Sequence, residues 1–346
     1  MKKLLVLIVA FSASFCFLYI LVSMDQPARH ASLKAAHLPP LIAIHDLFSA
    51  RSGSEADATV QETASKPGTK VGWRDPSGTE SAVTPVLILP QTGTYPGPLP
   101  TVVLIGSRPE SGASWDDERT IRFLANRGYA VLSIDCGALA ASSGVPGTQA
   151  GFQTTGGCTA ATIRDETRRL TERKIADKAA LAVIGSGLGS YLALMTMAQE
   201  PSLFKAAILH STGMDRAPSA PDDQIALKPQ KAVATGPIQL GRPDQGEASS
   251  AVPALLDLAQ RIEGAVLITH GNADTVAPAE HAHILAHALY SAGNHVKTAF
   301  FNHEDHRYSR WQTRVQVARL QEDFLAHQLG GRNGGYDYIE LLAKLF

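Results

Sequence analysis

The chain has 346 residues, in which 31 Lys and Arg nearly balance 32 Asp and Glu for a formal net charge of −1. This length fits one globular domain of about 250 residues with additional segments. Because neither sign of charge is in excess, the sequence excludes the strongly basic surface by which nucleic-acid-binding proteins are recognised, and we expect no nucleic acid partner.

The N-terminus predicts a membrane segment. Met1 and two lysines precede an uninterrupted run of apolar and small residues from Leu4 to Met24. The run is long enough to cross a bilayer, and no clean cleavage site follows it closely. Residues 1–24 therefore favour an uncleaved signal anchor, with a cleaved signal peptide and a secreted protein as the alternative. Lysines before the segment place the rest of the chain in the periplasm or outside the cell.

The three cysteines leave their pairing open. Cys16 lies within the apolar run, and Phe15 before it is a poor match to a lipoprotein processing site, so no lipid anchor is expected. Cys136 and Cys158 can pair in an oxidising compartment, but two cysteines in a large domain are equally compatible with buried free thiols.

Composition divides the rest of the chain. Residues 25–81 are rich in Ala, Ser, Thr, Gly and Pro without sustained periodicity, which predicts a stalk with little structure of its own. Residues 82–332 follow as an ordered domain, interrupted at 211–250 by a Pro-rich and Gly-rich insertion. The tail, 333–346, predicts a short helix that docks on the domain itself or on a partner.

Short apolar segments alternate with helix-forming segments in the ordered domain. This alternation is typical of a parallel sheet, because each crossover connection supplies a helix. The sequence therefore predicts an α/β fold with a mostly parallel central sheet and helices on both faces. The expected strands are Val83–Leu89, Thr101–Ile105, Tyr129–Ile134, Ala179–Ile184, Phe204–His210, Ala265–His270 and Val296–Phe301, and the expected helices are Asp116–Asn126, Ala160–Lys174, Tyr191–Gln199, Pro278–Ser291 and Ser309–Leu329.

Three glycines follow the expected strand Ala179–Ile184. Gly185 and Gly189 flank Gly187 at two positions before and two after, and a helix-forming segment comes next. This is the strand-turn-helix spacing of the nucleophile elbow of serine hydrolases, whose strained turn needs small flanking residues. Gly187 stands where the attacking serine is expected, so the spacing predicts a hydrolase fold that lacks its nucleophile.

The same glycines also fit the start of a dinucleotide-binding loop. That fingerprint needs a third glycine or alanine where Ser190 lies, and an acidic residue at the end of the next strand, which instead ends in His210. We therefore expect no nucleotide cofactor.

Several segments between about Thr84 and Arg332 resemble the catalytic domain of the prolyl oligopeptidase family of serine peptidases. They are Pro96–Leu104, similar to the family's first core strand, Phe123–Leu132, similar to its next helix and strand, the acid loop His270–Pro278 and the histidine loop Phe301–His306. Pro39–Phe48 also resembles the opening of the β-propeller that precedes this domain in the family. The resemblance implies the α/β-hydrolase fold.

Carried over residue by residue, the resemblance implies Asp274 as the acid that orients a histidine, His306 as the general base, and Gly187 at the position of the nucleophile. Their order along the chain is that of the hydrolase fold. Taken alone, Asp274 also fits a turn residue before a helix, and His306 a loop histidine. With Gly187 there is no hydroxyl proton for the histidine to take.

The oxyanion hole departs from the family as well. Leu188 still offers the backbone N–H after the nucleophile position, and a second donor is expected from Ser107, in the loop after the first core strand. The family's His-Gly-Gly-Pro is here Gly106–Pro109, and its Asn-x-Arg-Gly is here Asp135–Ala138. Three altered elements of one site indicate release from catalysis.

Two serines flank Gly187 and provide an alternative nucleophile. Ser186 precedes the turn and is expected to point away from the pocket. Ser190 lies in the first turn of the helix, where a hydroxyl usually bonds free backbone groups.

A metal site is not expected. His283 and His287 lie four residues apart on one expected helix, as zinc ligands can. No Glu accompanies them as in His-Glu-x-x-His, and no third ligand is evident, so we interpret them as surface histidines.

Three hypotheses follow. The first is a membrane-anchored peptidase homologue with hydrolysis lost or impaired, which binds a peptide or a small acyl ligand. The second is an active serine peptidase or esterase that uses Ser186 or Ser190. The third is a docking protein that binds a protein partner through the stalk, the insertion and the tail.

Overall fold

The structure is a computed structural model of the chain, and it describes residues 41–48, 69–72, 85–90, 97–106, 117–136, 158–212 and 258–335. All of them belong to the unit that extends from Ala36 to Phe346. The predicted signal anchor, Ser107, nearly all of the insertion and most of the tail lie outside the described residues. Within these ranges no helix has both the length and the apolar character needed to span a membrane.

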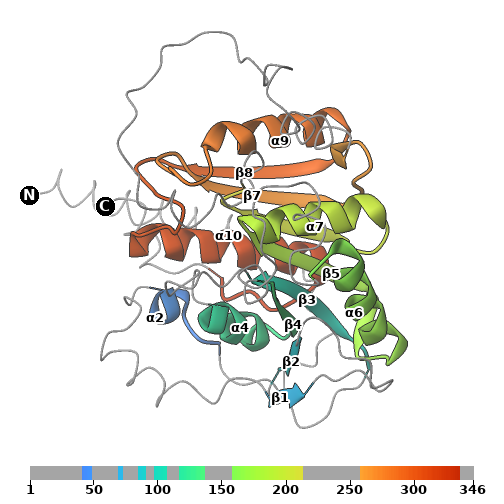
Figure 1. Ribbon diagram of the computed structural model, residues 1–346. Helices are drawn as coiled ribbons and strands as arrows, with labels where there is room; N and C mark the ends of the chain where they lie inside the picture. The colour runs from blue at the N-terminus through green and yellow to red at the C-terminus, as the bar shows by residue number, and fades with distance from the viewer. Residues whose placement is uncertain are drawn as a thin grey trace, which may run out of the picture. The chain divides into compact units, whose positions relative to one another are not determined.

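One eight-stranded sheet organises the described residues (Figure 1). The strand order is β1-β2-β4-β3-β5-β6-β7-β8; β2 is antiparallel to both of its neighbours, and all other pairs are parallel. The predicted mostly parallel sheet is thus confirmed. The strands are β1 Thr69–Gly72, β2 Val86–Leu89, β3 Leu99–Gly106, β4 Ala130–Asp135, β5 Ala176–Ser186, β6 Ala206–His210, β7 Ala265–Gly271 and β8 His295–Phe301.

The central strands are buried on both faces, which explains their continuously apolar sequences. In β5, Leu181 and Val183 belong to one hydrophobic cluster, and Ala182 and Ile184 belong to the other. Helices cover both clusters, as predicted. The first contains side chains of α6 Ala160–Glu172, α7 Leu188–Gln199 and α9 Ala279–Ser291, and the second contains side chains of α2 Ile44–Phe48, α4 Asp117–Asn126 and α10 Trp311–Leu329.

Local sequence explains where α6 begins and where α10 ends. Thr159 caps α6, because its Oγ1 accepts the backbone N–H of Thr162 at 3.1 Å. Gly330 ends α10 in the left-handed conformation, with φ 81°, which glycine adopts without strain.

Two short elements, α2 and β1, lie within residues 25–81, where the sequence predicts a stalk with little structure of its own. The apolar side chains of α2, Ile44, Leu47 and Phe48, are buried against α4 and α10. The carbonyl of Phe48 also accepts a hydrogen bond from Nε of Arg314 at 3.1 Å. So short a helix is stabilised by this tertiary burial, which periodicity over five residues does not reveal.

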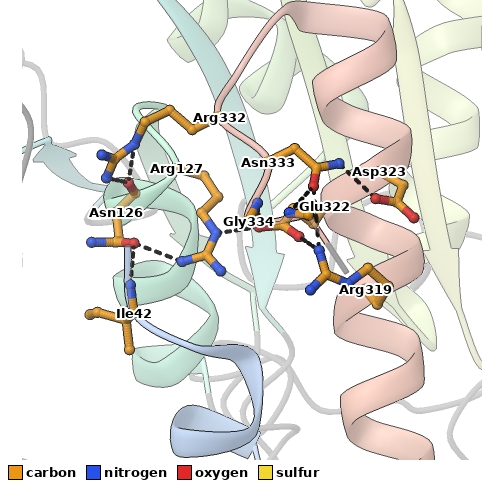
Figure 2. Close-up of polar contacts among 10 residues, drawn as sticks. Ile42, Asn126, Arg127, Arg319, Glu322, Asp323, Arg332, Asn333 and Gly334 are labelled. Carbon is orange, nitrogen blue, oxygen red and sulfur yellow. Dashed lines mark hydrogen bonds and ion pairs between the residues drawn. The ribbon is translucent and has the colours of Figure 1, made fainter. Parts of the chain in front are cut away.

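A buried ion pair holds the segment after α10. Nε of Arg127 lies 2.6 Å from Oε1 of Glu322, and both side chains are almost inaccessible (Figure 2). Arg319 contacts the other oxygen of Glu322, and the backbone N–H of Gly334 donates to Oε1 at 3.0 Å. Arg332 binds the last backbone carbonyl of α4. The segment that follows α10 is therefore fastened to α4 and α10 by charged hydrogen bonds.

Cys136 and Cys158 form a disulfide, with Cα atoms 5.4 Å apart. The bond joins the carboxyl end of β4 to the residues before α6, and both cysteines are buried. Of the two alternatives that the sequence left open, the structure has the paired one.

Candidate active site

The carboxyl ends of the parallel strands bring the predicted site residues together. Gly187 follows β5, Asp274 follows β7, and His306 follows β8. Because these strands run in the same direction, the segments that leave them meet at one edge of the sheet. Residues more than 100 positions apart in the sequence therefore contact each other.

Gly187 forms the turn between β5 and α7 with φ 53° and ψ −117°. Its N–H donates to the carbonyl of His210 at 3.0 Å, and its carbonyl accepts the N–H of Ser190 at 3.1 Å. This backbone conformation is one that residues with a side chain rarely adopt, and it is the kind of strained turn on which an elbow presents its nucleophile. The turn has this geometry, and the residue in it carries no side chain.

Close backbone contacts explain the flanking glycines. A Cβ on Gly185 would lie 2.3 Å from the backbone of Gly189, and a Cβ on Gly189 would lie 2.6 Å from the carbonyl oxygen of Ile105. No other residue fits at either position without a shift of backbone. The predicted need for small residues on both sides of the elbow is confirmed.

Asp274 is held in the turn between β7 and α9. Its Oδ1 accepts the backbone N–H groups of Val276 and Ala277, each at 2.8 Å. Its Oδ2 lies 2.7 Å from Nδ1 of His306 and 3.3 Å from Nε2 of His270. Burial raises the pKa of Asp274, but the hydrogen bonds from the two histidines and Ala277 outweigh it and hold the pKa well below its usual range. The carboxylate is therefore ionised at neutral pH.

The ionised carboxylate fixes the tautomer of His306. Nδ1 faces the ionised carboxylate of Asp274 and donates to it, so in the neutral imidazole Nε2 carries the lone pair. Nε2 lies 3.5 Å from the position that a Cβ on Gly187 would occupy, and the imidazole is 25% exposed. A hydroxyl on that Cβ would be within reach of Nε2. Asp274 and His306 are thus hydrogen-bonded to each other beside a residue that offers no hydroxyl.

The acid loop and the histidine loop pack directly on each other. A Cβ on Gly271 would lie 2.4 Å from the carbonyl oxygen of Glu304, so the close approach requires glycine. The N–H of Ala273 donates to the same carbonyl at 2.9 Å. The buried carboxylate of Glu304 accepts from Oγ1 of Thr313 at 2.6 Å, which ties the histidine loop to α10.

A buried polar cluster beside the histidine loop was not predicted. Nδ1 of His210 lies 2.7 Å from Oγ1 of Thr269, which lies 2.8 Å from the hydroxyl of Tyr308, and Ser211 donates its hydroxyl to the carbonyl of His306 at 2.9 Å. Burial lowers the pKa of His210 to about 4 and raises the pKa of Tyr308 to about 12, so both are neutral at pH 7. His210 ends β6 and Thr269 lies near the end of β7, whereas Tyr308 comes from the loop before α10, so no single motif marks this cluster in the sequence.

The other candidate residues have different surroundings. Leu188 is the first residue of α7, where backbone N–H groups have no intrahelical acceptor. Ser107 lies outside the described residues. The buried hydroxyl of Ser190 bonds the carbonyls of Gly185 at 2.8 Å and His210 at 3.0 Å, as expected for a serine in the first helical turn. Ser186 ends β5 and is partly buried.

The two histidines of α9 are exposed on its surface. His283 stacks on the ring of Phe300 with centroids 3.7 Å apart, and His287 lines a shallow depression together with Gln260. The described part of the chain holds no cluster of three or more His, Cys, Asp or Glu residues arranged for a metal ion.

The model of the prolyl oligopeptidase family matches residues 115–332 of this chain. The match covers more than half of the chain and includes the elbow, the acid loop and the histidine loop. A comparison with curated proteins gave no match.

Solved peptidase structures have a similar fold at low sequence identity. An acylaminoacyl peptidase from Pyrococcus horikoshii is 14% identical with a TM-score of 0.58, and the match covers 84% of this chain and 47% of that one. A puromycin-hydrolyzing peptidase from Mycobacterium tuberculosis is 19% identical with a TM-score of 0.55, and the match covers 78% of this chain and 40% of that one. Dipeptidyl peptidase 4 from Porphyromonas gingivalis is 20% identical with a TM-score of 0.56, and the match covers 80% of this chain and 38% of that one. The chain spans less than half the length of each of them. Together with the strand order, these likenesses confirm the α/β-hydrolase fold.

Proposed function

Because the chain belongs to the prolyl oligopeptidase family, we propose that it is a peptidase homologue whose site binds a peptide or a small acyl ligand, with hydrolysis impaired at Gly187. One observation carries this proposal. Nε2 of His306 faces Gly187 across 3.5 Å, measured to the position of a Cβ, in an elbow that keeps the strained backbone of a nucleophile. This contact supports the proposal, because the imidazole and the carboxylate that a serine hydrolase uses lie beside a residue without a hydroxyl.

The retained hydrogen bonds support ligand binding without covalent catalysis. The N–H of Leu188 begins a helix whose dipole favours partial negative charge, such as that of a ligand carbonyl oxygen. The imidazole of His306 is partly exposed and able to bond a ligand through Nε2. Without a serine, these groups hold an acyl group but form no acyl-enzyme.

A peptide chloromethyl ketone tests binding at this site. A solved acylaminoacyl peptidase is in complex with Z-Gly-Gly-Phe-chloromethyl ketone, which makes that compound a suitable first probe. In the full chain we expect Nε2 of His306 to displace chloride from the chloromethyl carbon, with a rate that saturates as the probe concentration rises. Peptide mapping should place the adduct on His306, and Asp274→Asn should slow the reaction because the imidazole then loses its fixed orientation.

His303 is the internal control for this labelling. It is exposed and lies three residues before His306, but it has no carboxylate partner of the kind that Asp274 provides. Equal labelling of both histidines, or labelling without saturation, would mean that no ligand site forms around His306, and the proposed function would be wrong.

Fluorophosphonate labelling tests the alternative, which is an active serine peptidase or esterase. We expect no adduct on the full chain. The alternative requires an adduct on Ser186 or Ser190 that is lost in His306→Ala. The Ser190 hydroxyl is already bonded to two backbone carbonyls, which argues against Ser190 as the nucleophile.

We further propose that the domain faces the periplasm or the exterior, held by the apolar segment Leu4–Met24. The disulfide between Cys136 and Cys158 supports an oxidising compartment. Protease treatment of intact cells with a permeable outer layer should degrade the domain, whereas a cytoplasmic domain would be protected.

A further inference from the structure

Gly187 and His306 together leave room for a nucleophile that is not part of the chain. A serine side chain adds one carbon and one hydroxyl oxygen to Cα, and the oxygen of a water molecule or a short alcohol can approach His306 where that hydroxyl would lie. At residue 187 these atoms are replaced by hydrogen, and the nearest side-chain atoms to the Cβ position are Nε2 and Cε1 of His306, at 3.5 and 3.7 Å.

The surroundings of that space are those of a general base. Asp274 is ionised and bonds Nδ1 of His306, so Nε2 is an acceptor directed at residue 187. The imidazole is 25% exposed, which admits small molecules from solution. The first N–H of α7 belongs to the residue after Gly187, and an N–H at the start of a helix is able to stabilise an oxyanion.

We propose that the site transfers acyl groups directly to a small nucleophile from solution, water or a short alcohol, which takes the place of the serine hydroxyl. This inference rests on the proposed function, because the acyl ligand must first bind. It differs from the mechanism of a serine hydrolase in that one displacement replaces two, and no acyl-enzyme forms.

The step balances without a cofactor. The oxygen of the alcohol forms a bond to the carbonyl carbon of a bound ester, while its proton passes to Nε2 of His306. The tetrahedral oxyanion then collapses, the bond to the leaving alcohol breaks, and the proton on Nε2 passes to that alcohol. The products are a new ester and the free leaving alcohol. With water as the nucleophile, the products are a carboxylic acid and the same alcohol.

Methanolysis of p-nitrophenyl acetate by the full chain tests the inference. We expect the rate of p-nitrophenol release to rise with methanol concentration, with methyl acetate as the matching product and no acylated protein by intact mass. tert-Butanol, which is larger than a serine side chain, should have no such effect. Removing the base in His306→Ala should lower the methanol-dependent rate by about 100-fold or more.

Gly187→Ala is the matched control, because its methyl group fills the carbon position while adding no hydroxyl. It should keep the folded structure, measured by circular dichroism, and lose most of the methanol-dependent rate. A rate that does not depend on methanol, or that is equal in wild type and Gly187→Ala, would overturn the inference. If the methanolysis test fails while the chloromethyl ketone still alkylates His306 specifically in the same preparation, only this inference is wrong and the proposed function stands. If His306 is not alkylated specifically either, the proposed function is wrong as well.

Discussion

Gly189, at the start of α7, lies against the carbonyl oxygen of Ile105, near the end of β3, so that a Cβ on residue 189 would be 2.6 Å from that oxygen. The helix that follows the elbow is thereby fixed against a neighbouring strand by backbone alone. The position of the elbow therefore depends in part on this backbone contact.

We predict that Gly189→Ala destabilises the fold by about 1–3 kcal/mol, because the backbone must shift to accept the methyl group. Urea unfolding measures the change. Gly97→Ala is the matched control, since a Cβ there meets no atom within 4 Å. Equal midpoints for the two variants would show that the contact is not rigid.

Gly187→Ser should restore a nucleophile. We expect a fluorophosphonate adduct at residue 187, absent from wild type and lost again when His306→Ala is added. The serine must adopt φ 53°, at a cost of about 1–3 kcal/mol in stability. A folded Gly187→Ser variant without adduct would mean that the oxyanion site, and not only the nucleophile, has been lost.

The sheet and its helices were predictable because their signals are local. Each central strand is a short apolar run such as Ala265–His270, and each helix has the length and composition of a crossover connection. α2 and β1 were missed, because five and four residues carry too little pattern and both elements depend on contacts with distant parts of the chain.

The site was predictable only in part. The resemblance gave the positions of Asp274 and His306, since their loops keep the family's order. The polar cluster of His210, Thr269 and Tyr308 could not be derived, because its members are 59 and 39 residues apart along the chain and none has a recognisable motif.

Glu322→Gln should cost about 3–5 kcal/mol, because it leaves Arg127 as a buried charge without its counterion. Chemical unfolding of the variant measures this loss. Asp323→Asn changes the neighbouring carboxylate, which is exposed, and should cost less than about 1 kcal/mol. Comparable losses in both variants would contradict the buried ion pair.

His210 should make the fold sensitive to mild acid. Burial lowers its folded pKa from 6.5 to about 4, so between these values the unfolded chain binds a proton that the folded chain does not. The free energy of unfolding therefore falls as pH decreases from about 6.5 to about 4, by on the order of 3 kcal/mol. His210→Gln keeps a polar side chain near Thr269 and should flatten this dependence, whereas His303→Gln, at an exposed position, should not. A pH profile unchanged in His210→Gln would contradict the assignment.

The disulfide predicts a count of reactive thiols. In denaturant without reductant, one cysteine of three, Cys16, should react with a maleimide, and all three should react after reduction. Replacing both Cys136 and Cys158 by serine should cost about 3 kcal/mol, since the bond closes a segment with a sequence separation of 22. Three reactive thiols before reduction would show that the pair is not oxidised.

Because of the hydrogen bonds of Asp274, replacing this residue would disturb the local structure more than a change at residue 187 does. Without the carboxylate of Asp274, two backbone N–H groups and an imidazole would lose their acceptor, and the turn before α9 would lose its anchor. A change from serine to glycine at residue 187 removes no such bond and relieves backbone strain. Asp274 therefore supports the turn before α9 whether or not residue 187 carries a nucleophile, so its place beside His306 is explained by the structure of that turn as well as by any reaction.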